Sequence, residues 1–354
     1  MLTLPVHLPR QGVAVAFYPH HVEHLAPLCQ MFDVPLLATT RKTQAAAMWY
    51  PGLRCATLPA SGADSLAEVL EGLQRYGIIL WSHFFPRADL DVQFKRLRWQ
   101  PRVVYCPHGF SEKNSPRNGR DTDQDIRLLY RLTPADGRPR RIIGGDLPRW
   151  YYEAQRAAFD ARLPAPLVAT GTDRTVVYAP TYDDPLKRSS LAPIFEDLVA
   201  HVPAGIRLIV KPHPILCADP RVLTQMRRVV AASRRSVLIE DCPLTHALLS
   251  RADALISDMS SMAYLFLAYG RPLILLNQNA GRIGDVRTSR LAACSTVISP
   301  DGYGQIWTSV LRQLQQFQPT PGTSNARVAL YDLIYGSAPD VPRIASEIAA
   351  ACIS

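Results

Sequence analysis

Short apolar runs recur along the chain, separated by segments in which apolar residues repeat at helical spacing. The alternation is most regular in the second half. There it predicts strands at residues 175–179, 207–210, 237–239, 254–257 and 273–276, and helices at 191–200, 220–231, 244–250 and 261–269. Strands that alternate with helices in this way are typical of parallel sheets covered by helices on both faces.

The first half follows the same pattern less regularly. It predicts buried strands at residues 13–18, 78–81 and 102–105, and a helix at 65–75. A stretch rich in proline and small residues at 162–171 indicates a domain boundary. We therefore predict an α/β protein of two Rossmann-like, doubly wound parallel-sheet domains that face each other across a cleft. The expected domains are residues 1–165 and 166–335, with a C-terminal helix in 336–354 that crosses back to the first domain.

Composition narrows the class of protein. Hydrophobic residues make up 47% of the chain and charged residues 19%, so sizeable cores are expected. The formal net charge of +9 indicates an anionic partner, such as a nucleotide, a polyanion, nucleic acid or an acidic membrane face, and a solvated basic surface explains it equally well. The seven scattered cysteines form no C-x-x-C pair, which favours a reducing compartment. Without a signal peptide or the roughly 18 apolar residues of a membrane span, a cytoplasmic protein is expected.

Polar residues directly follow several predicted strands, at the edge where open α/β sheets bind ligands. After the strand at 207–210 comes the sequence Lys-Pro-His-Pro. Lys211 offers a fixed positive charge and His213 a hydrogen-bond donor, which together suit a diphosphate. The alternative is that His213 merely caps a loop.

Two further segments point to the same edge. Asp258, Ser260 and Ser261 lie where the strand at 254–257 gives way to a helix, whose N-terminus either binds an anion or is simply capped by serine. Asp258 is expected to cap the helix, contact a ribose or orient a hydrogen-bond donor. Thr181 follows the strand at 175–179 and offers a hydroxyl for phosphate. The neighbouring Tyr182 offers a ring for a base or acceptor, or only packs.

His108 follows the strand at 102–105 in the first domain. Gly109 beside it frees the backbone to turn sharply. An imidazole with an ordinary pKa near 6.5 can accept a proton from an attacking hydroxyl. The alternative is that His108 binds substrate or stabilises its loop. Glu112 and Lys113 add charges of both signs nearby, and with Gly109 they are the acceptor-side candidates.

Other polar patterns predict no site. The carboxylate pairs at 121–123 and 183–184 lack the further ligands that a metal needs. His20, His21 and His24 have no accompanying H-E-x-x-H pattern, which favours an exposed helix start over a zinc site. The basic stretches at 138–141 and 227–235 lack the interleaved aromatic residues of a nucleic-acid groove, so no nucleic-acid partner is expected.

Four motifs, taken in order, resemble the CDP-glycerol glycerophosphotransferase family, which includes teichoic-acid polymerases and primases. They are His-Gly at 108–109, Tyr-Ala-Pro-Thr at 178–181, Lys-Pro-His-Pro at 211–214, and Asp-x-Ser-Ser at 258–261 with Gly-Arg-Pro at 270–272. The resemblance runs from about residue 100 to residue 280, and residues 1–100 contribute only a compatible α/β pattern.

This resemblance implies a GT-B fold, a CDP-linked polyol donor, and no cofactor or metal. It implies that His108 is the base on the acceptor hydroxyl and that His213, Lys211 and the helix start at Ser260 and Ser261 hold the diphosphate. It also implies transfer of a polyol phosphate, with glycerol phosphate the first candidate, to a glycan or lipid-linked acceptor in teichoic-acid-like or capsule synthesis, with release of CMP. A lipid-linked acceptor makes the inner membrane face a candidate attachment surface.

The chain departs from the family after residue 272. Where the family has aromatic residues and then an acidic, tyrosine-bearing segment, this chain has Leu-Ile-Leu-Leu-Asn-Gln-Asn followed by Asp285 and Arg287, which substitute for it only in part. Arg287 is accordingly a donor-binding candidate. Two alternatives stay open: a nucleotide-sugar glycosyltransferase or sugar 2-epimerase on the same fold, and a non-catalytic protein that binds nucleotides or polyanions.

Overall fold

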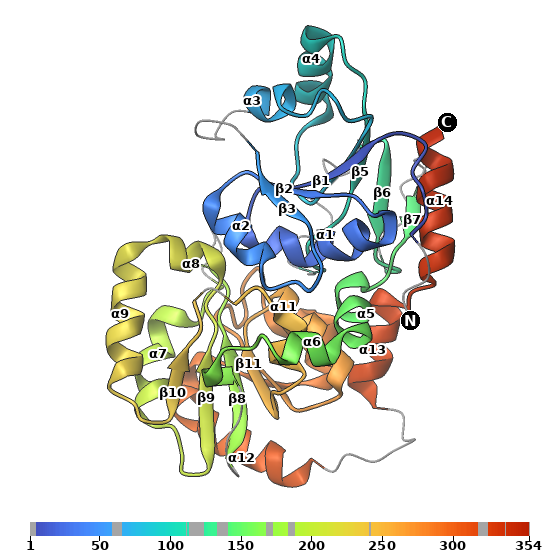
Figure 1. The fold of residues 1–354 in the computed structure, drawn as a ribbon. Coiled ribbons are helices and arrows are strands. Elements are labelled where there is room, and N and C mark those ends of the chain that lie inside the picture. Colours follow the sequence, from blue (N-terminus) through green and yellow to red (C-terminus); the bar gives the residue numbers. More distant parts are fainter. Residues whose placement is uncertain are drawn as a thin grey trace. The chain divides into compact units, whose positions relative to one another are not determined.

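The computed structural model describes residues 5–58, 66–110, 112, 124–132, 141–167, 173–182, 188–240, 242–317, 325–336 and 338–353. The chain forms two compact units (Figure 1). Unit 1 comprises Met1–Phe110, Pro116–Arg162 and Leu333–Ser354, and unit 2 comprises Ser111–Ser115 and Leu163–Asp332. The chain thus passes from unit 1 to unit 2 within the proline-rich stretch at 162–171.

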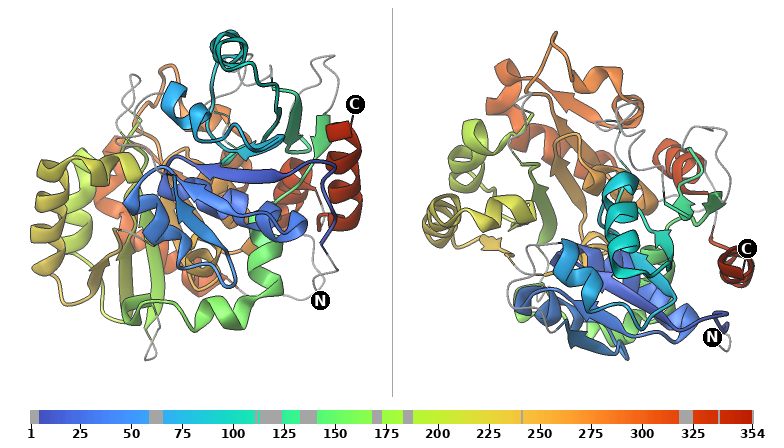
Figure 2. Two further views of the ribbon diagram at one scale, coloured as in Figure 1. Left: turned by 45° about the horizontal axis from the view of Figure 1, so that its top comes forward. Right: turned by 90° about the horizontal axis from the view of Figure 1, so that it is seen from above.

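Unit 1 contains a seven-stranded parallel sheet in the order β3-β2-β1-β4-β5-β6-β7. Its strands are β1 (Gly12–Ala16), β2 (Leu36–Ala38), β3 (Cys55–Thr57), β4 (Ile78–Trp81), β5 (Arg102–Tyr105), β6 (Ile126–Leu129) and β7 (Arg141–Ile143). Its helices are α1 (Pro19–Phe32), α2 (Arg41–Ala47), α3 (Leu66–Glu71), α4 (Arg87–Leu97), α5 (Leu147–Ala154), α6 (Arg156–Asp160) and α14 (Val341–Ile353). Helix α14 packs against β7, far from it in sequence (Figures 1 and 2).

Unit 2 contains a six-stranded parallel sheet in the order β10-β9-β8-β11-β12-β13. Its strands are β8 (Arg174–Ala179), β9 (Ile206–Val210), β10 (Ser236–Leu238), β11 (Ala254–Ser257), β12 (Leu273–Leu276) and β13 (Thr296–Ile298). Its helices are α7 (Leu191–Ala200), α8 (Pro214–Ala218), α9 (Pro220–Ala231), α10 (Thr245–Leu249), α11 (Ser261–Phe266) and α12 (Ile306–Gln316), while α13 (Ala326–Tyr335) runs through the boundary at Asp332.

The central strands are buried on both faces, which explains their continuous apolar sequences. Every residue of β1, β4, β11 and β12 is buried. Trp81 at the end of β4 and Tyr178 in β8 are 0% exposed and belong to the separate cores of the two units. These strands therefore fix the positions of the loops that follow them.

The strand order locates the ligand-binding edge of each sheet. In unit 1 the chain first moves outward from β1 to β3 and then returns to β4, so the topological switch point lies between β1 and β4. In unit 2 the same reversal occurs between β8 and β11. Ligands of open α/β sheets bind beyond the carboxyl ends of the strands at such points. The loops after β1, β4, β8 and β11 are therefore the first places to look for a site.

Most elements predicted in the second half are confirmed. The strands at 254–257 and 273–276 and the helices at 191–200 and 220–231 have the predicted bounds. The helix predicted at 261–269 is wrong in part, because α11 ends at Phe266 and continues as a 3-10 turn at Leu267–Tyr269. The helix predicted at 65–75 is observed as the shorter α3.

Candidate active site

The loops after β8 and β11 are joined by a buried carboxylate. Asp258 is 0% exposed, and its Oδ2 accepts hydrogen bonds from the backbone N–H groups of Thr181 at 2.8 Å and Ser190 at 3.2 Å. The N-cap of α11 is Ser260, so the expectation that Asp258 caps this helix is wrong. Asp258 instead fixes the loop after β8 at the switch point of unit 2.

Thr181 and Tyr182 lie deeper than the sequence suggested. Thr181 is 2% exposed, although we expected its hydroxyl to be accessible to a phosphate. Tyr182 is partly buried against the unit 2 core, and its ring centroid lies 4.9 Å from that of His213. The packing alternative for Tyr182 is therefore the one observed, and the ring also supports His213.

His213 caps helix α8. Its Nδ1 accepts a hydrogen bond from the backbone N–H of Ile215 at 3.2 Å, and the ring is only partly buried. Because Nδ1 uses its lone pair in this bond, the hydrogen of the neutral ring is on Nε2. The loop-capping role that we considered as an alternative is therefore present, and it makes Nε2–H of His213 a hydrogen-bond donor.

The other predicted donor-side residues lie at the same edge of unit 2. Lys211 immediately follows β9, next to β8 in the sheet, and is partly buried. Ser260 and Ser261 begin α11 after β11. Ser257 Oγ donates to Ala179 O at 2.7 Å and lies 3.0 Å from Ser260 Oγ, so the Ser260 hydroxyl bonds to Ser257 and does not cap the helix backbone.

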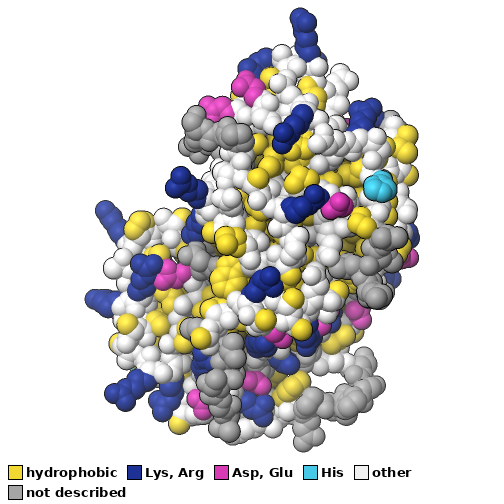
Figure 3. Space-filling model, viewed as in Figure 1, with side chains coloured by type: hydrophobic (Ala, Val, Ile, Leu, Met, Phe, Trp, Pro, Cys, Tyr) yellow, Lys and Arg dark blue, Asp and Glu magenta, His cyan; other side chains and the backbone are white. Residues whose placement is uncertain are grey.

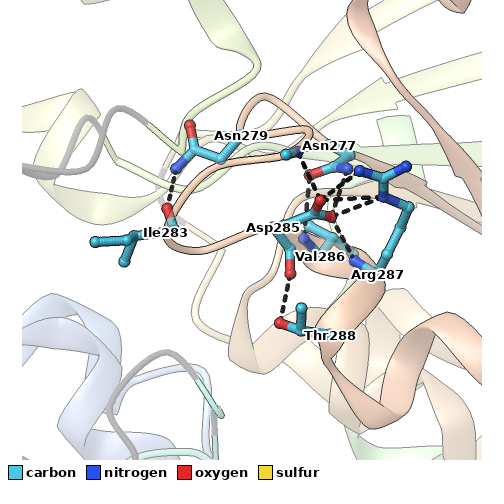
Figure 4. Close-up of polar contacts among 8 residues, drawn as sticks. Asn277, Asn279, Ile283, Asp285, Val286, Arg287 and Thr288 are labelled. Atoms are coloured by element: carbon cyan, nitrogen blue, oxygen red, sulfur yellow. Dashed lines mark hydrogen bonds and ion pairs between the residues drawn. The ribbon is translucent and has the colours of Figure 1, made fainter.

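The loop after β12 is organised around Asp285 (Figure 4). Its carboxylate accepts hydrogen bonds from Asn277 Nδ2 at 2.8 Å, Gly281 N at 2.7 Å and Arg287 N at 2.9 Å. The Arg287 guanidinium, 2.6 Å away, is the largest cause that holds the pKa of Asp285 well below its usual range. The side chain of Arg287 remains 56% exposed. Asp285 is thus a structural residue that orients Arg287. The sequence had indicated only that Asp285 substitutes in part for the family's acidic segment.

In unit 1, His108 is held by the loop after β4. Its Nδ1 lies 2.9 Å from the carbonyl oxygen of Ser82, and Ser82 Oγ in turn donates to Cys106 O at 2.7 Å. A carbonyl can only accept, so Nδ1 of His108 carries the hydrogen and Nε2 of the neutral ring has the free lone pair. Desolvation lowers the pKa of His108, and the hydrogen bond to Ser82 opposes this effect.

Gly109 allows the turn beside His108. Its φ of +128° is one that residues with a side chain rarely adopt. The Gly109 N–H donates to Tyr130 Oη at 3.0 Å, and Tyr130 Oη donates to Pro107 O at 3.2 Å. Tyr130, in the segment after β6, thus fixes the loop that carries His108.

His20 and His21 also lie at this edge, and one expectation about them is wrong. We expected an exposed helix start, but His21 is 1% and His24 7% exposed, because α1 is buried around nearly its whole circumference. The ring centroids of His20 and His21 lie 5.4 Å and 5.3 Å from that of His108. His83 was missed, although the rule that polar residues after a strand mark a site applies to it directly.

The remaining acceptor-side candidates are Glu112 and Lys113. Glu112 belongs to unit 2, where its carboxylate accepts hydrogen bonds from the backbone N–H and the guanidinium of Arg290 at 2.9 Å and 2.6 Å. This carboxylate therefore serves an ion pair within unit 2. Lys113 lies outside the described residues, as do the carboxylate pairs at 121–123 and 183–184.

The described residues contain no group of three or more His, Cys, Asp or Glu side chains placed to hold a metal ion. Within the same part of the chain, no helix has the length and apolar character needed to span a membrane. Lys and Arg side chains are spread over the face shown in Figure 3 and do not gather in one patch. Arg227 of the predicted basic stretch pairs with Glu240 at 2.6 Å.

The sequence was compared with models of known protein families. Residues 148–287 match the model of the CDP-glycerol:poly(glycerophosphate) glycerophosphotransferase family. Over this segment the chain is similar to that family. The resemblance inferred from the motifs is therefore confirmed. The matched segment includes the loops of Thr181, His213 and Asp258, and His108 lies outside it.

Solved structures confirm the GT-B fold. The wall teichoic acid polymerase TagF matches 97% of this chain and 88% of its own at 11% identity, with a TM-score of 0.62. UDP-GlcNAc 2-epimerase from Neisseria meningitidis, bound to UDP-GlcNAc, matches 97% of this chain and 99% of its own at 10% identity, with a TM-score of 0.58. S. aureus MnaA with UDP matches 96% of both chains at 12% identity, with a TM-score of 0.57. No curated protein matches the sequence.

Proposed function

We propose that this protein transfers a polyol phosphate, glycerol phosphate first among the candidates, from a CDP-linked donor to an acceptor hydroxyl. The observation that carries the proposal is the opposite tautomers of two histidines at the carboxyl edges of the two sheets. His108 offers a lone pair on Nε2, whereas His213 offers a hydrogen on Nε2. One ring is prepared to accept a proton and the other to donate a hydrogen bond to an anion.

The reaction follows from these roles. His108 Nε2 takes the proton of the acceptor hydroxyl as its oxygen attacks the distal phosphorus of the CDP-linked polyol. The bond from that phosphorus to the bridging oxygen breaks, and CMP leaves with the electron pair. His213 Nε2–H and the ammonium of Lys211 bind the phosphate on which negative charge develops. Arg287 adds a further cation, held in place by Asp285.

Asp258 is a positioning residue in this proposal. Its carboxylate is buried and bound to the backbone of Thr181 and Ser190, so it fixes the loop and does not reach the ligand itself. Ser260 and Ser261 at the start of α11 supply backbone N–H groups to the diphosphate, and Ser261 also supplies its hydroxyl. The acceptor is a glycan or lipid-linked molecule, and contact with the inner membrane face would bring the enzyme to it.

Variants separate the two histidine roles. His108→Ala should retain affinity for CDP-glycerol and lose turnover, because the ring acts on the acceptor. His213→Ala should weaken donor binding and lower turnover by about 10²–10³, the usual cost of one oxyanion-stabilising hydrogen bond. The exposed His201, beyond α7, provides a matched control that should leave both quantities unchanged. An active His213→Ala enzyme would contradict the donor-site assignment.

A nucleotide panel tests the reaction itself. The enzyme is incubated with CDP-glycerol or UDP-GlcNAc, and CMP, UDP and the epimerised sugar are measured. CMP release from CDP-glycerol in the presence of an acceptor supports the proposal. Epimerisation of UDP-GlcNAc would favour the alternative suggested by the 2-epimerase neighbours, and saturable binding without turnover would indicate a non-catalytic binding protein.

A further inference from the structure

Four histidines come together at the carboxyl edge of unit 1. His20 and His21 begin α1, His83 follows β4, and His108 follows β5. Ring centroids are separated by 4.6 Å for His20–His21, 5.4 Å for His20–His108, 5.3 Å for His21–His108 and 5.9 Å for His21–His83. We call these residues the histidine cluster. It lies at the topological switch point between β1 and β4.

The cluster can hold little positive charge. His21 is 1% exposed, and its buried Nδ1 has no hydrogen-bond partner among the described residues. A charged imidazole in this place would lack both water and a counter-charge. Burial lowers the pKa of His21 well below its usual value, and the positive charges that His20, His108 and His83 acquire on protonation lower it further.

His108 differs from the other members in its surroundings. Its ring reaches solvent, whereas the His20 ring stands edge-on to it at 62° and the His21 ring lies tilted at 33°. The bond from Nδ1 to Ser82 O leaves Nε2 as the basic atom. His108 is thus the member that meets the acceptor, and its neighbours displace water from its ring.

We propose that His20 and His21 are positioning residues for His108, which cover one flank of its otherwise exposed imidazole and hold it as an unprotonated acceptor for the hydroxyl proton. The inference rests on the proposed function, because it concerns the group to which that function assigns the proton. Covering the ring disfavours its charged form and thereby keeps Nε2 available at lower pH. Burial lowers the pKa of both His83 and His21, and the charge that His108 acquires during transfer lowers the two pKa values further.

Among the residues that the structure describes, the titratable groups packed around His108 agree with this role. Helix α1 presents His20 and His21, the segment after β4 presents His83, and the segment after β5 presents Cys106, whose pKa burial raises to about 12. Tyr130 approaches through Gly109, and burial raises the pKa of its hydroxyl well above the usual value. No described carboxylate contributes to the shift of His108, so nothing there stabilises its charged form except the carbonyl of Ser82.

The test compares two replacements of His20, which is only partly buried. His20→Ala uncovers the flank of His108, whereas His20→Phe keeps an aromatic ring there. The pKa of His108 is measured by proton NMR of the imidazole ring, with its resonance assigned by its loss in His108→Gln. Circular dichroism establishes that each variant is folded, and His201→Ala serves as the control.

We expect the pKa of His108 to lie below about 6.5 in the wild type and in His20→Phe, and to rise toward that value in His20→Ala. An unchanged pKa in folded His20→Ala would overturn the inference. The acid limb of kcat/KM tests the proposed function separately. If the NMR pKa rises and the acid limb moves with it, His108 is the base. If only the NMR pKa rises, the covering role stands and the base assignment fails.

Discussion

Asp258 and Asp253 offer a matched pair of perturbations at opposite ends of the same two strands. Asp258 follows β11 and accepts the N–H of Thr181 after β8, at the ligand-binding edge. Asp253 precedes β11 and accepts the N–H of Thr175 at 2.8 Å, at the opposite edge. Both carboxylates link β8 to β11, but only Asp258 lies at the proposed site.

The magnitudes follow from the hydrogen bonds that are lost. Asp258→Ala leaves two buried backbone N–H groups without an acceptor, at about 1–3 kcal/mol each, and should cost about 2–6 kcal/mol of unfolding free energy. Asp253→Ala leaves one such group and should cost about 1–3 kcal/mol. Its ion pair with Arg174, whose side chain is 65% exposed, adds at most about 1 kcal/mol.

Two assays separate stability from binding. Urea unfolding of unit 2 can be followed by fluorine NMR of labelled Trp307, the tryptophan of that unit. Titration calorimetry with CDP-glycerol measures donor affinity under native conditions. Both variants should be destabilised, but only Asp258→Ala should bind CDP-glycerol more weakly. Unchanged donor affinity in folded Asp258→Ala, or an equal loss in Asp253→Ala, would refute the reasoning.

Three further predictions concern the loops. Folding lowers the pKa of Asp285, so its ionised carboxylate stabilises the folded protein. The difference in unfolding free energy between wild type and Asp285→Asn should be complete above about pH 4 and should shrink as the pH falls through the folded-state pKa. Urea unfolding at a series of pH values measures this difference. Gly270→Ala should cost about 1–3 kcal/mol, measured by thermal unfolding, because φ is +64° and the new Cβ would lie 2.7 Å from Asn325 Nδ2. Tyr130→Phe removes the acceptor of the Gly109 N–H and so loosens the loop that carries His108. Turnover should fall while donor affinity stays the same, and a turnover equal to that of the wild type would contradict this prediction.

The fold was largely predictable from sequence where apolar runs are long and the central strands are buried on both faces. Strands β4, β5, β11 and β12 have the predicted bounds for this reason. Five strands were missed. Of these, β2, β3, β7 and β13 have three residues each, too few for a pattern of period two to stand out, and β3 is partly exposed; β6 has four buried residues and was missed as well.

The placement of Lys211, His213 and Ser260 at the carboxyl edge of the unit 2 sheet was predictable, because these residues follow strands in short, specific motifs. The roles within it were not. Asp258 looks like a helix cap in sequence, and only the sheet order places it against Thr181, 77 residues away. The histidine cluster depends in the same way on α1 and β4 meeting beside β5, which spacing along the chain does not reveal.

The central claim of this account is that His108 and His213 are held in opposite tautomers. Nitrogen NMR of the imidazole rings at neutral pH distinguishes them directly, because protonated and unprotonated ring nitrogens have well-separated chemical shifts. The account predicts hydrogen on Nδ1 of His108, bound to Ser82 O, and hydrogen on Nε2 of His213, whose Nδ1 accepts from Ile215. The same tautomer at both positions, or a His108 ring that is charged at neutral pH, would contradict it.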